Sequence, residues 1–163
     1  MRMKDFYKSH LIHSSKDATW RTPRWLFDEL NLEFNFGLDG AATQESTLVP
    51  DNWYGPDHPD EGRRDGLSRD WSSDTSKMVW LNPPYGTGVT QAWLQKATVE
   101  ASKGIETMVL IPSRTGTLWF HDLCFPHRIR FIKRRLKFND GNKPAPFDSA
   151  LVWIKGQPDP GYF

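Results

Sequence analysis

The sequence predicts an α/β fold with a mostly parallel sheet and an antiparallel hairpin at its C-terminal end. Two short apolar segments, residues 77–81 and 107–111, flank a segment of helical periodicity at residues 90–103. This strand–helix–strand order is typical of a parallel crossover, and the second apolar segment is continuous, as in a buried parallel strand. Two later apolar segments, residues 129–132 and 149–154, are joined by a turn at residues 139–146 that contains Gly and Pro. This pattern predicts the hairpin.

Two helices are predicted outside the crossover. Thr22 can cap the first and Pro23 suits its opening position. Its apolar face comprises Trp25, Leu26, Phe27 and Leu30. A shorter helix is predicted at residues 117–123. Residues 1–19 are polar and aperiodic, so we expect a flexible N-terminal arm there, followed by a single domain over residues 20–163.

Two strand ends supply candidate site residues. Residues 34–39 alternate and predict a strand that ends in a turn of small residues. Because ligands bind at the carboxyl ends of strands in such sheets, Asp39 and Asn82 are candidates for a site. Residues 51–74 are rich in Pro, Gly, Asp and Arg. They predict a long loop, which in a compact domain is usually functional or mobile.

The charge distribution indicates more than the net charge of +1. Residues 127–143 contain seven basic residues and one acidic residue. A basic stripe on a mildly acidic body is typical of a local contact with a polyanion. It is equally compatible with a strand edge that charge protects from aggregation, so the charge pattern alone leaves both interpretations open.

The remaining composition excludes several kinds of site. Cys124 is the single cysteine, so no intramolecular disulfide and no zinc site of several thiolates can form. The five histidines lack the spacing of metal ligands, and we expect no metal. No apolar run approaches the ~20 residues of a membrane span, and no signal peptide opens the chain. We therefore expect a cytoplasmic protein without a membrane partner, and the oligomeric state stays unknown.

The most informative tetrapeptide is Asn82-Pro83-Pro84-Tyr85, which stands between an apolar strand and a helix. The exocyclic amine of a nucleobase is a poor nucleophile because its lone pair is delocalised into the ring. The Asn82 side-chain oxygen and the Pro83 carbonyl could accept both amine hydrogens and favour the nucleophilic form, and the two prolines would keep these acceptors in place. Tyr85 could stack on the target base. The alternative is an ordinary strand-ending turn.

These pieces together resemble the phage-encoded DNA N6-adenine methyltransferases, the small Dam-like enzymes of phages and prophages. The similarity covers about residues 20–155 and lies in an ordered series of motifs. These are Trp20-Arg-Thr-Pro23 with Leu26-Phe27, Leu38-Asp39-Gly-Ala-Ala42, Asp65-Gly-Leu67 with Asp70-Trp71, Asn82-Pro-Pro-Tyr85, and Arg135-Leu-Lys-Phe138 through Ser149-Ala-Leu151.

The resemblance implies a function as well as a fold. The fold would be the Rossmann-like one of methyltransferases that depend on S-adenosyl-L-methionine, in a single catalytic domain. The reaction would be site-specific methylation of the N6 amine of adenine, with double-stranded DNA as partner, inside the bacterial host of a phage or prophage. Methyl transfer is an in-line displacement that needs orientation more than acid or base groups, so the lack of an obvious catalytic dyad is compatible with it.

The resemblance also assigns residues to the cofactor. Thr22 and Pro23 match the segment near its methionine end. Asp65 and Leu67 match the residues that meet its adenine. The cofactor-binding turn after the first strand is matched by Asp39, Gly40, Ala41 and Ala42. This turn lacks a Gly-x-Gly signature, and no clear acidic residue presents itself for the ribose.

Further residues are assigned to the substrate. Asn82 to Tyr85 match the catalytic motif, and Phe138 and Phe147 flank the hairpin where related enzymes place an aromatic clamp for the flipped base. Either phenylalanine could instead belong to the core. Arg134 and Arg135 are candidates for phosphate contacts. Trp20 and Trp71 are expected to pack in the core rather than to bind a ligand.

Two alternatives stay open. Asn-Pro-Pro-Tyr is shared with methyltransferases of RNA and of protein glutamine, whose amines need the same activation, so an RNA adenine or a glutamine side chain could be the substrate. A catalytically inactive nucleic-acid-binding module with this fold belongs to another class. The recognition sequence cannot be inferred.

Overall fold

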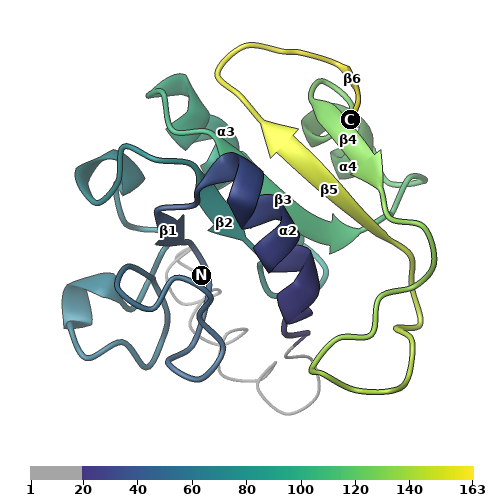
Figure 1. Ribbon diagram of the computed structural model, residues 1–163. Helices are drawn as coiled ribbons and strands as arrows, with labels where there is room; N and C mark the ends of the chain where they lie inside the picture. Colours follow the sequence, from purple (N-terminus) through teal and green to yellow (C-terminus); the bar gives the residue numbers. More distant parts are fainter. Residues whose placement is uncertain (1–19) are drawn as a thin grey trace.

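A six-stranded sheet forms the centre of the computed structural model, which describes residues 20–163. Its strands follow the order β1-β2-β3-β5-β4-β6 (Figure 1). Their bounds are β1 (Leu38–Asp39), β2 (Val79–Leu81), β3 (Thr107–Pro112), β4 (Arg128–Phe131), β5 (Ser149–Ile154) and β6 (Gly161–Tyr162). The first three strands pair in parallel, as do β4 and β6, whereas β5 runs antiparallel to both β3 and β4. The predicted α/β class is confirmed.

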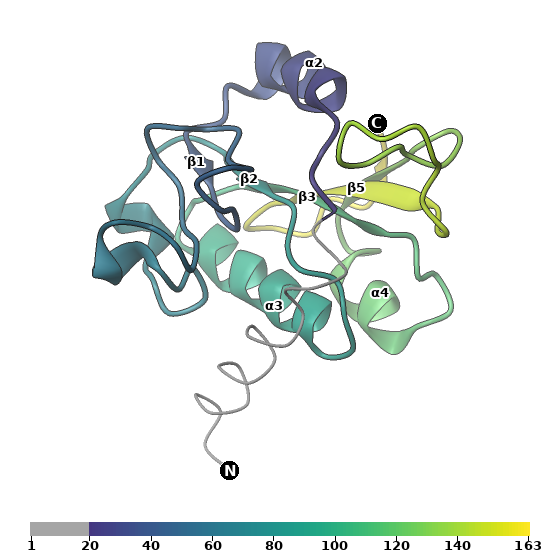
Figure 2. The ribbon, with the colours of Figure 1, turned by 90° about the horizontal axis from the view of Figure 1, so that it is seen from below.

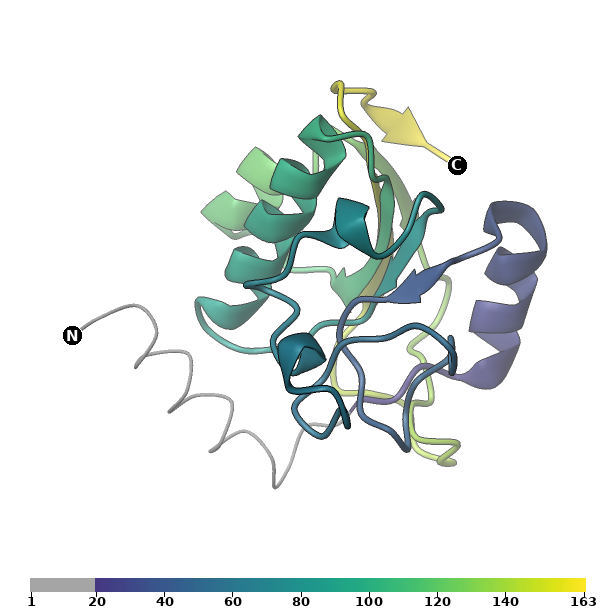
Figure 3. The same ribbon diagram turned by 90° about the vertical axis from the view of Figure 1, so that its left-hand side faces the viewer.

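Helices cover both faces of the sheet. α2 (Arg24–Phe34) lies on one face, and α3 (Val89–Ser102) and α4 (Leu118–Leu123) lie on the other (Figure 2). Seen edge-on, the sheet separates these two helical layers (Figure 3). Two short 3-10 helices, η2 (Glu61–Arg63) and η3 (Trp71–Ser73), lie in the segment between β1 and β2. In the part of the chain that the structure describes, no helix has the length and apolar character to cross a membrane.

The alternation of side chains along the strands divides the interior into two cores. In β2, Val79 and Leu81 pack on the α3 side, whereas Trp80 packs on the α2 side. The ring of Trp80 lies 5.6 Å from that of Phe27 in α2, edge to face. β3 and β5 repeat this alternation. Residues 108–111 are all apolar and all buried, because both faces of β3 are covered and no position faces water.

α2 begins differently from the prediction. Pro23, not Thr22, occupies its N-cap, and no side chain caps the helix. The Thr22 hydroxyl instead accepts a hydrogen bond from the side chain of Asn82, 60 residues further along the chain, at 3.0 Å. The predicted capping role of Thr22 is therefore wrong, because a distant partner engages its hydroxyl. The arm predicted for residues 1–19 lies outside the described residues.

The strand predicted at residues 34–39 is shortened to β1, Leu38–Asp39. α2 continues through Phe34 and ends at Asn35, which adopts the left-handed conformation with φ 50. Asn35 donates its backbone N–H to the carbonyl of Asn31 at 3.0 Å, and asparagine tolerates this conformation better than most residues. The alternating pattern therefore belongs to a helix end followed by a turn, and only its last two residues pair in the sheet.

β4 and β5 pair antiparallel, with Ile129 opposite Val152, and the segment that connects them is longer than the turn predicted at residues 139–146. Residues 132–148 leave the sheet as an excursion that we call the β4–β5 loop. Within it the backbone N–H of Ala145 donates to the carbonyl of Leu136 at 2.8 Å, and both side chains are buried. The loop carries most of the basic residues that the sequence concentrates before β5.

An ion-pair network organises the long loop between β1 and β2. The Asp74 carboxylate accepts hydrogen bonds from Arg69 at 2.8 Å and from Arg63 at 3.0 Å, and the Tyr54 hydroxyl donates to the same group. Arg63 also donates to the Asn52 side chain at 2.6 Å. The hydrogen bond from Arg69 and the nearby positive charges hold the pKa of Asp74 below its usual range. Charge-assisted hydrogen bonds thus fix this loop at several points.

Replacing Asp74 with alanine is expected to lower the free energy of unfolding by about 2–4 kcal/mol, because Arg63 would remain partly buried without its partner. The side chain of Asp74 is 9% exposed and that of Arg63 is 20% exposed. Urea unfolding followed by tryptophan fluorescence measures the change. Asp51→Ala, at an exposed position of the same loop, is the matched control and should change stability by less than about 0.5 kcal/mol. Equal stabilities of the two variants would contradict a structural role for the network.

Candidate active site

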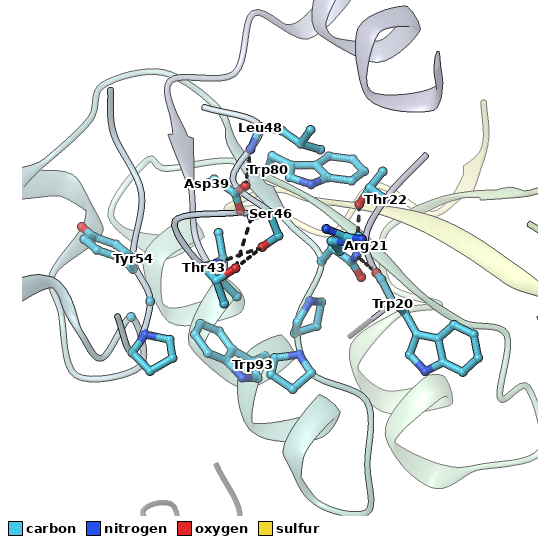
Figure 4. A pocket seen from close by; sticks show the side chains of 18 of the residues that line it. Trp20, Arg21, Thr22, Asp39, Thr43, Ser46, Leu48, Tyr54, Trp80 and Trp93 are labelled. Atoms are coloured by element: carbon cyan, nitrogen blue, oxygen red, sulfur yellow. Dashed lines mark hydrogen bonds between the residues drawn. The ribbon is translucent and has the colours of Figure 1, made fainter. Parts of the chain in front are cut away.

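The carboxyl ends of β1 and β2 meet beside a pocket of about 210 Å³. Asp39 ends β1, where it lies opposite Trp80, and Asn82 directly follows β2. Both line the pocket, as expected for strand-end residues of a parallel sheet. Figure 4 shows Asp39, Trp80, Arg21 and Trp93 around it. The walls thus come from the segment before α2, the turn after β1, the long loop, β2 and α3.

Asp39 is a buried carboxylate with one free oxygen. Only 3% of the residue is exposed. Its Oδ2 accepts the backbone N–H of Leu48 at 3.0 Å, and its Oδ1 has no hydrogen-bond partner within residues 20–163. Burial raises the pKa of Asp39 to about 6, because removal from water disfavours the charged form. A buried acceptor without a partner costs free energy, so this oxygen suits a donor from a bound ligand.

The side-chain amide of Asn82 is fixed at both ends. Its Nδ2 donates to the carbonyl of Trp20 at 2.6 Å and to Thr22 Oγ1 at 3.0 Å. Because a carbonyl can only accept, the amide nitrogen must face Trp20, and this sets the orientation of the amide. Asn82 Oδ1 accepts the hydroxyl of Tyr85 at 2.7 Å and has the capacity for one more hydrogen bond. Burial raises the pKa of Tyr85 above its usual range, so the hydroxyl keeps its proton.

Four aromatic rings pack beside Asn82. Trp20 lies edge-on to Phe138 at 5.5 Å and to Phe147 at 5.0 Å between ring centroids. Tyr85 lies edge-on to Phe147 at 5.6 Å. Such arrangements are favourable beyond the area they bury. Phe138 is only 4% exposed, whereas Phe147 is half-buried, so Phe147 has the more accessible ring of the two predicted clamp residues.

Five of the eight residues predicted to bind a cofactor line the pocket. The other three do not line it: Pro23 occupies the N-cap of α2, Gly40 donates its backbone N–H to the carbonyl of Trp80, and Leu67 packs against the core. Each of the three adjoins a lining residue in the chain. The residues that line the pocket are Thr22, Asp39, Ala41, Ala42 and Asp65.

The two arginines predicted to meet phosphate lie on the β4–β5 loop, outside the pocket lining. Arg134 is exposed and has a left-handed backbone with φ 67. Arg135 lies 3.5 Å from Asp148, and both side chains are more than half exposed. A pair of this kind contributes little to stability, so both guanidinium groups are available at the surface of the loop that also carries Phe138 and Phe147.

Trp20 has a position that its sequence context does not predict. It packs against the core as expected, but it also lines the pocket, and its carbonyl accepts a hydrogen bond from the Asn82 amide. Trp80 and Trp93 line the same pocket. In a chain with eight tryptophans, no local signal separates those that line a pocket from those that fill a core. Trp71, by contrast, is fully buried, as predicted.

No metal site accompanies the pocket in the described chain. Among residues 20–163, no three His, Cys, Asp or Glu side chains gather in a way that could hold a metal ion. The polar groups at the pocket are instead a free carboxylate oxygen on Asp39 and an oriented amide on Asn82. Such a site can bind hydrogen-bond donors and orient an amine.

The pocket and its tetrapeptide can be compared with known protein families. The model of the family described as DNA N-6-adenine-methyltransferase (Dam) matches residues 8–152. The chain belongs to this family. The matched region contains Asp39, the Asn82 tetrapeptide and the whole β4–β5 loop, and the resemblance predicted from the motifs is confirmed.

This member of the Dam family is also similar to a protein from a phage. It is 28% identical over 102 residues to a DNA N-6-adenine-methyltransferase of Escherichia phage T1. The match covers 62% of this chain and 38% of the relative. The chain therefore matches less than half the length of that relative.

Proposed function

We propose that this chain is a DNA methyltransferase that transfers a methyl group from S-adenosyl-L-methionine to the N6 amine of adenine at specific sites in double-stranded DNA. The observation that carries the proposal is the oriented amide of Asn82 at the edge of the pocket. Trp20 and Thr22 hold its nitrogen, and its oxygen can accept one further hydrogen bond. Membership of the DNA N-6-adenine-methyltransferase family supports DNA as the substrate.

The pocket suits S-adenosyl-L-methionine. The free Oδ1 of Asp39 fits a hydroxyl or ammonium donor, and Trp80 and Trp93 supply aromatic walls for a flat base and for the chain that carries the sulfonium. Gly66 keeps one wall close, because a Cβ there would lie 2.6 Å from the carbonyl of Gly40. The residues that would hold the cofactor are the lining ones assigned above, namely Thr22, Asp39, Ala41, Ala42 and Asp65.

The Asn-Pro-Pro-Tyr turn would prepare the nucleophile. When bound, S-adenosyl-L-methionine supplies a methyl group on a sulfonium centre, which a nucleophilic nitrogen can accept. Asn82 Oδ1 and the Pro83 carbonyl accept the two hydrogens of the adenine amine, and this favours the pyramidal form with a localised lone pair. Pro83 and Pro84 restrict the backbone that carries these acceptors. The Tyr85 hydroxyl holds the Asn82 oxygen in place, so catalysis rests on orientation.

The target base would lie against the aromatic cluster. An adenine inside a duplex is inaccessible, so the enzyme has to turn it out of the stack. The rings of Tyr85 and Phe147 are half-buried and keep surface for such a base, with Phe138 packed behind them. Stacking on aromatic rings contributes about 1–3 kcal/mol per base.

The sheet itself fits a Rossmann-like methyltransferase fold. β1, β2 and β3 are parallel, and the pocket lies at the carboxyl ends of β1 and β2, as ligand sites do in doubly wound folds. The reversed β5 sits between β3 and β4. We propose that the β4–β5 pair is the predicted C-terminal hairpin, extended by its loop so that the loop can reach the DNA.

Arg134 and Arg135 are expected to contact phosphates of the DNA. Replacing both with alanine should weaken DNA binding and reduce the dependence of log Kd on log salt by about 0.9 per lost contact. Fluorescence anisotropy with a labelled duplex, at salt concentrations from about 50 to 200 mM, measures this slope. The control is Lys77→Ala, at an exposed lysine before the amino end of β2, whereas the pocket lies at the carboxyl end of that strand. An unchanged slope in the double variant would show that these arginines make no contact with the phosphates.

The proposed function can be tested in cells. The chain is expressed in a bacterial strain that lacks adenine methylation of its own, and plasmid DNA is digested to nucleosides and analysed by mass spectrometry. N6-methyladenine should appear only when the chain is expressed. Its absence, with soluble protein present, would speak against the proposal.

A further inference from the structure

The segment that orients the Asn82 amide, residues 20–22, is not part of a helix or strand and has to be fixed by other contacts. Trp20, Arg21 and Thr22 belong to no helix or strand, yet the first and the last accept the hydrogen bonds of the Asn82 amide. We call residues 20–22 the strap. The Tyr85 hydroxyl holds Asn82 Oδ1 and the strap holds the amide nitrogen, so the orientation of the amide depends in part on what holds the strap.

Asn139, in the β4–β5 loop, holds the strap through two hydrogen bonds. The backbone N–H of Arg21 donates to Asn139 Oδ1 at 2.7 Å. In return, the backbone N–H of Asn139 donates to the carbonyl of Arg21 at 3.0 Å. The two residues are 118 positions apart in the chain, and together these bonds close a ring between the strap and the loop.

The other polar contact of the strap is weaker. The guanidinium of Arg21 lies 2.7 Å from Glu45, but the two side chains are 39% and 82% exposed. Exposed ion pairs are screened by solvent and contribute little. The paired hydrogen bonds with Asn139 are therefore the principal polar attachment of the strap on the side away from Asn82, beside the packing of the Trp20 ring against Phe138 and Phe147.

The backbone of Asn139 suits this contact. It adopts the left-handed conformation with φ 59. Few residues other than glycine tolerate this conformation, and asparagine is one of them. Such conformations persist only where the surroundings demand them. Glycine at this position would keep the backbone geometry without the side-chain acceptor, whereas aspartate would keep both.

We propose that Asn139 is a positioning residue for methyl transfer, which fixes the strap and, through it, the amide of Asn82. The inference rests on the proposed function of the Asn82 site. Asn139 does not line the pocket, so it acts on the reaction through Trp20 and Thr22. The β4–β5 loop thereby has a second task besides presenting basic residues to DNA.

Kinetics separate this role from a structural one. Asn139→Gly should lower kcat for DNA methylation at least about tenfold, because a small displacement of an orienting group is costly. The KM for DNA and the Kd for S-adenosyl-L-methionine should stay within roughly twofold, since the lost interaction acts in the transition state. Asn139→Asp should retain most of kcat, because its carboxylate can accept the Arg21 N–H. Asn142→Gly, the same exchange at an exposed position of the loop, should leave kcat unchanged.

A spectroscopic readout tests the same idea without activity. The side-chain amide resonance of Asn82, identified by its loss in Asn82→Ala, should shift in Asn139→Gly and stay in place in Asn139→Asp and Asn142→Gly. Glycine adopts the left-handed conformation without strain, so Asn139→Gly is expected to fold, which its thermal melting verifies. An unmoved Asn82 resonance with unchanged kcat would overturn the positioning role. If the wild-type protein transfers no methyl group, the proposed function fails, and the resonance still decides whether Asn139 orients Asn82.

Discussion

Replacing Asn82 with alanine is expected to lower kcat for DNA methylation by about 10²–10³-fold, the usual effect of removing one preorganised hydrogen-bonding group from an active site. The substitution removes the proposed acceptor for the amine and leaves the carbonyl of Trp20 without its hydrogen-bond donor. Binding of DNA should change little, because the DNA contacts that we propose are made by basic residues outside the pocket. Single-turnover methyl transfer and anisotropy measure the two quantities separately.

Asn82→Asp tests how the amide is held. The aspartate keeps one acceptor oxygen, but its second oxygen replaces the amide nitrogen, which in the wild type lies 2.6 Å from the carbonyl oxygen of Trp20. Two facing oxygens repel each other, so this variant should also lose most of its activity. Activity near the wild-type level in either variant would show that the amide of Asn82 is not the group that prepares the amine.

Replacing Asp39 with asparagine is expected to weaken binding of S-adenosyl-L-methionine at least about tenfold, because a hydrogen bond to a charged group contributes about 1.5–3 kcal/mol. Asparagine can still accept the N–H of Leu48, so the turn after β1 should keep its shape. Isothermal titration calorimetry gives the Kd. Because burial raises the pKa of Asp39 to about 6, affinity of the wild-type protein should rise between about pH 5 and pH 7 as the carboxylate ionises.

The same substitution should change stability in the opposite direction. A carboxyl group whose pKa is raised by folding binds its proton more tightly in the folded state than in the unfolded state. Its stabilising contribution is therefore present below the unfolded pKa of about 3.9 and is lost as the pH rises towards 6. At neutral pH, Asp39→Asn should then be more stable than the wild type by on the order of 2 kcal/mol. Cofactor affinity independent of pH in the wild type, or an asparagine variant of lower stability, would contradict the burial of an ionised Asp39.

The strongest local patterns predicted the fold well. The crossover helix was expected at residues 90–103 and forms over Val89–Ser102, and the following strand was expected at residues 107–111 and forms over Thr107–Pro112. These elements depend on periodicity and burial, which the sequence expresses directly. The strand at residues 34–39 was mostly wrong because apolar residues at a helix end and in the turn after it produce the same alternation.

The site was predictable where it coincides with strand ends. Asp39 and Asn82 follow from the rule that ligands bind at the carboxyl edge of a parallel sheet. The contacts that orient Asn82 were not predictable, because they join residues far apart in the chain. Thr22 looked like a helix cap and engages Asn82, and Asn139 looked like a turn residue and engages Arg21. The residues next to Thr22 and Asn139 in the chain give no indication of these distant partners.

The most direct test of the central claim is transfer of labelled methyl groups from S-adenosyl-L-methionine to unmethylated duplex DNA by the purified protein, with Asn82→Ala beside the wild type. After digestion to nucleosides, the label should appear on the N6 amine of adenine with the wild type and be absent with the variant. Label on RNA but not on DNA would contradict the proposed substrate. No label on either, with no cofactor binding by calorimetry, would contradict an enzymatic function and favour an inactive nucleic-acid-binding module.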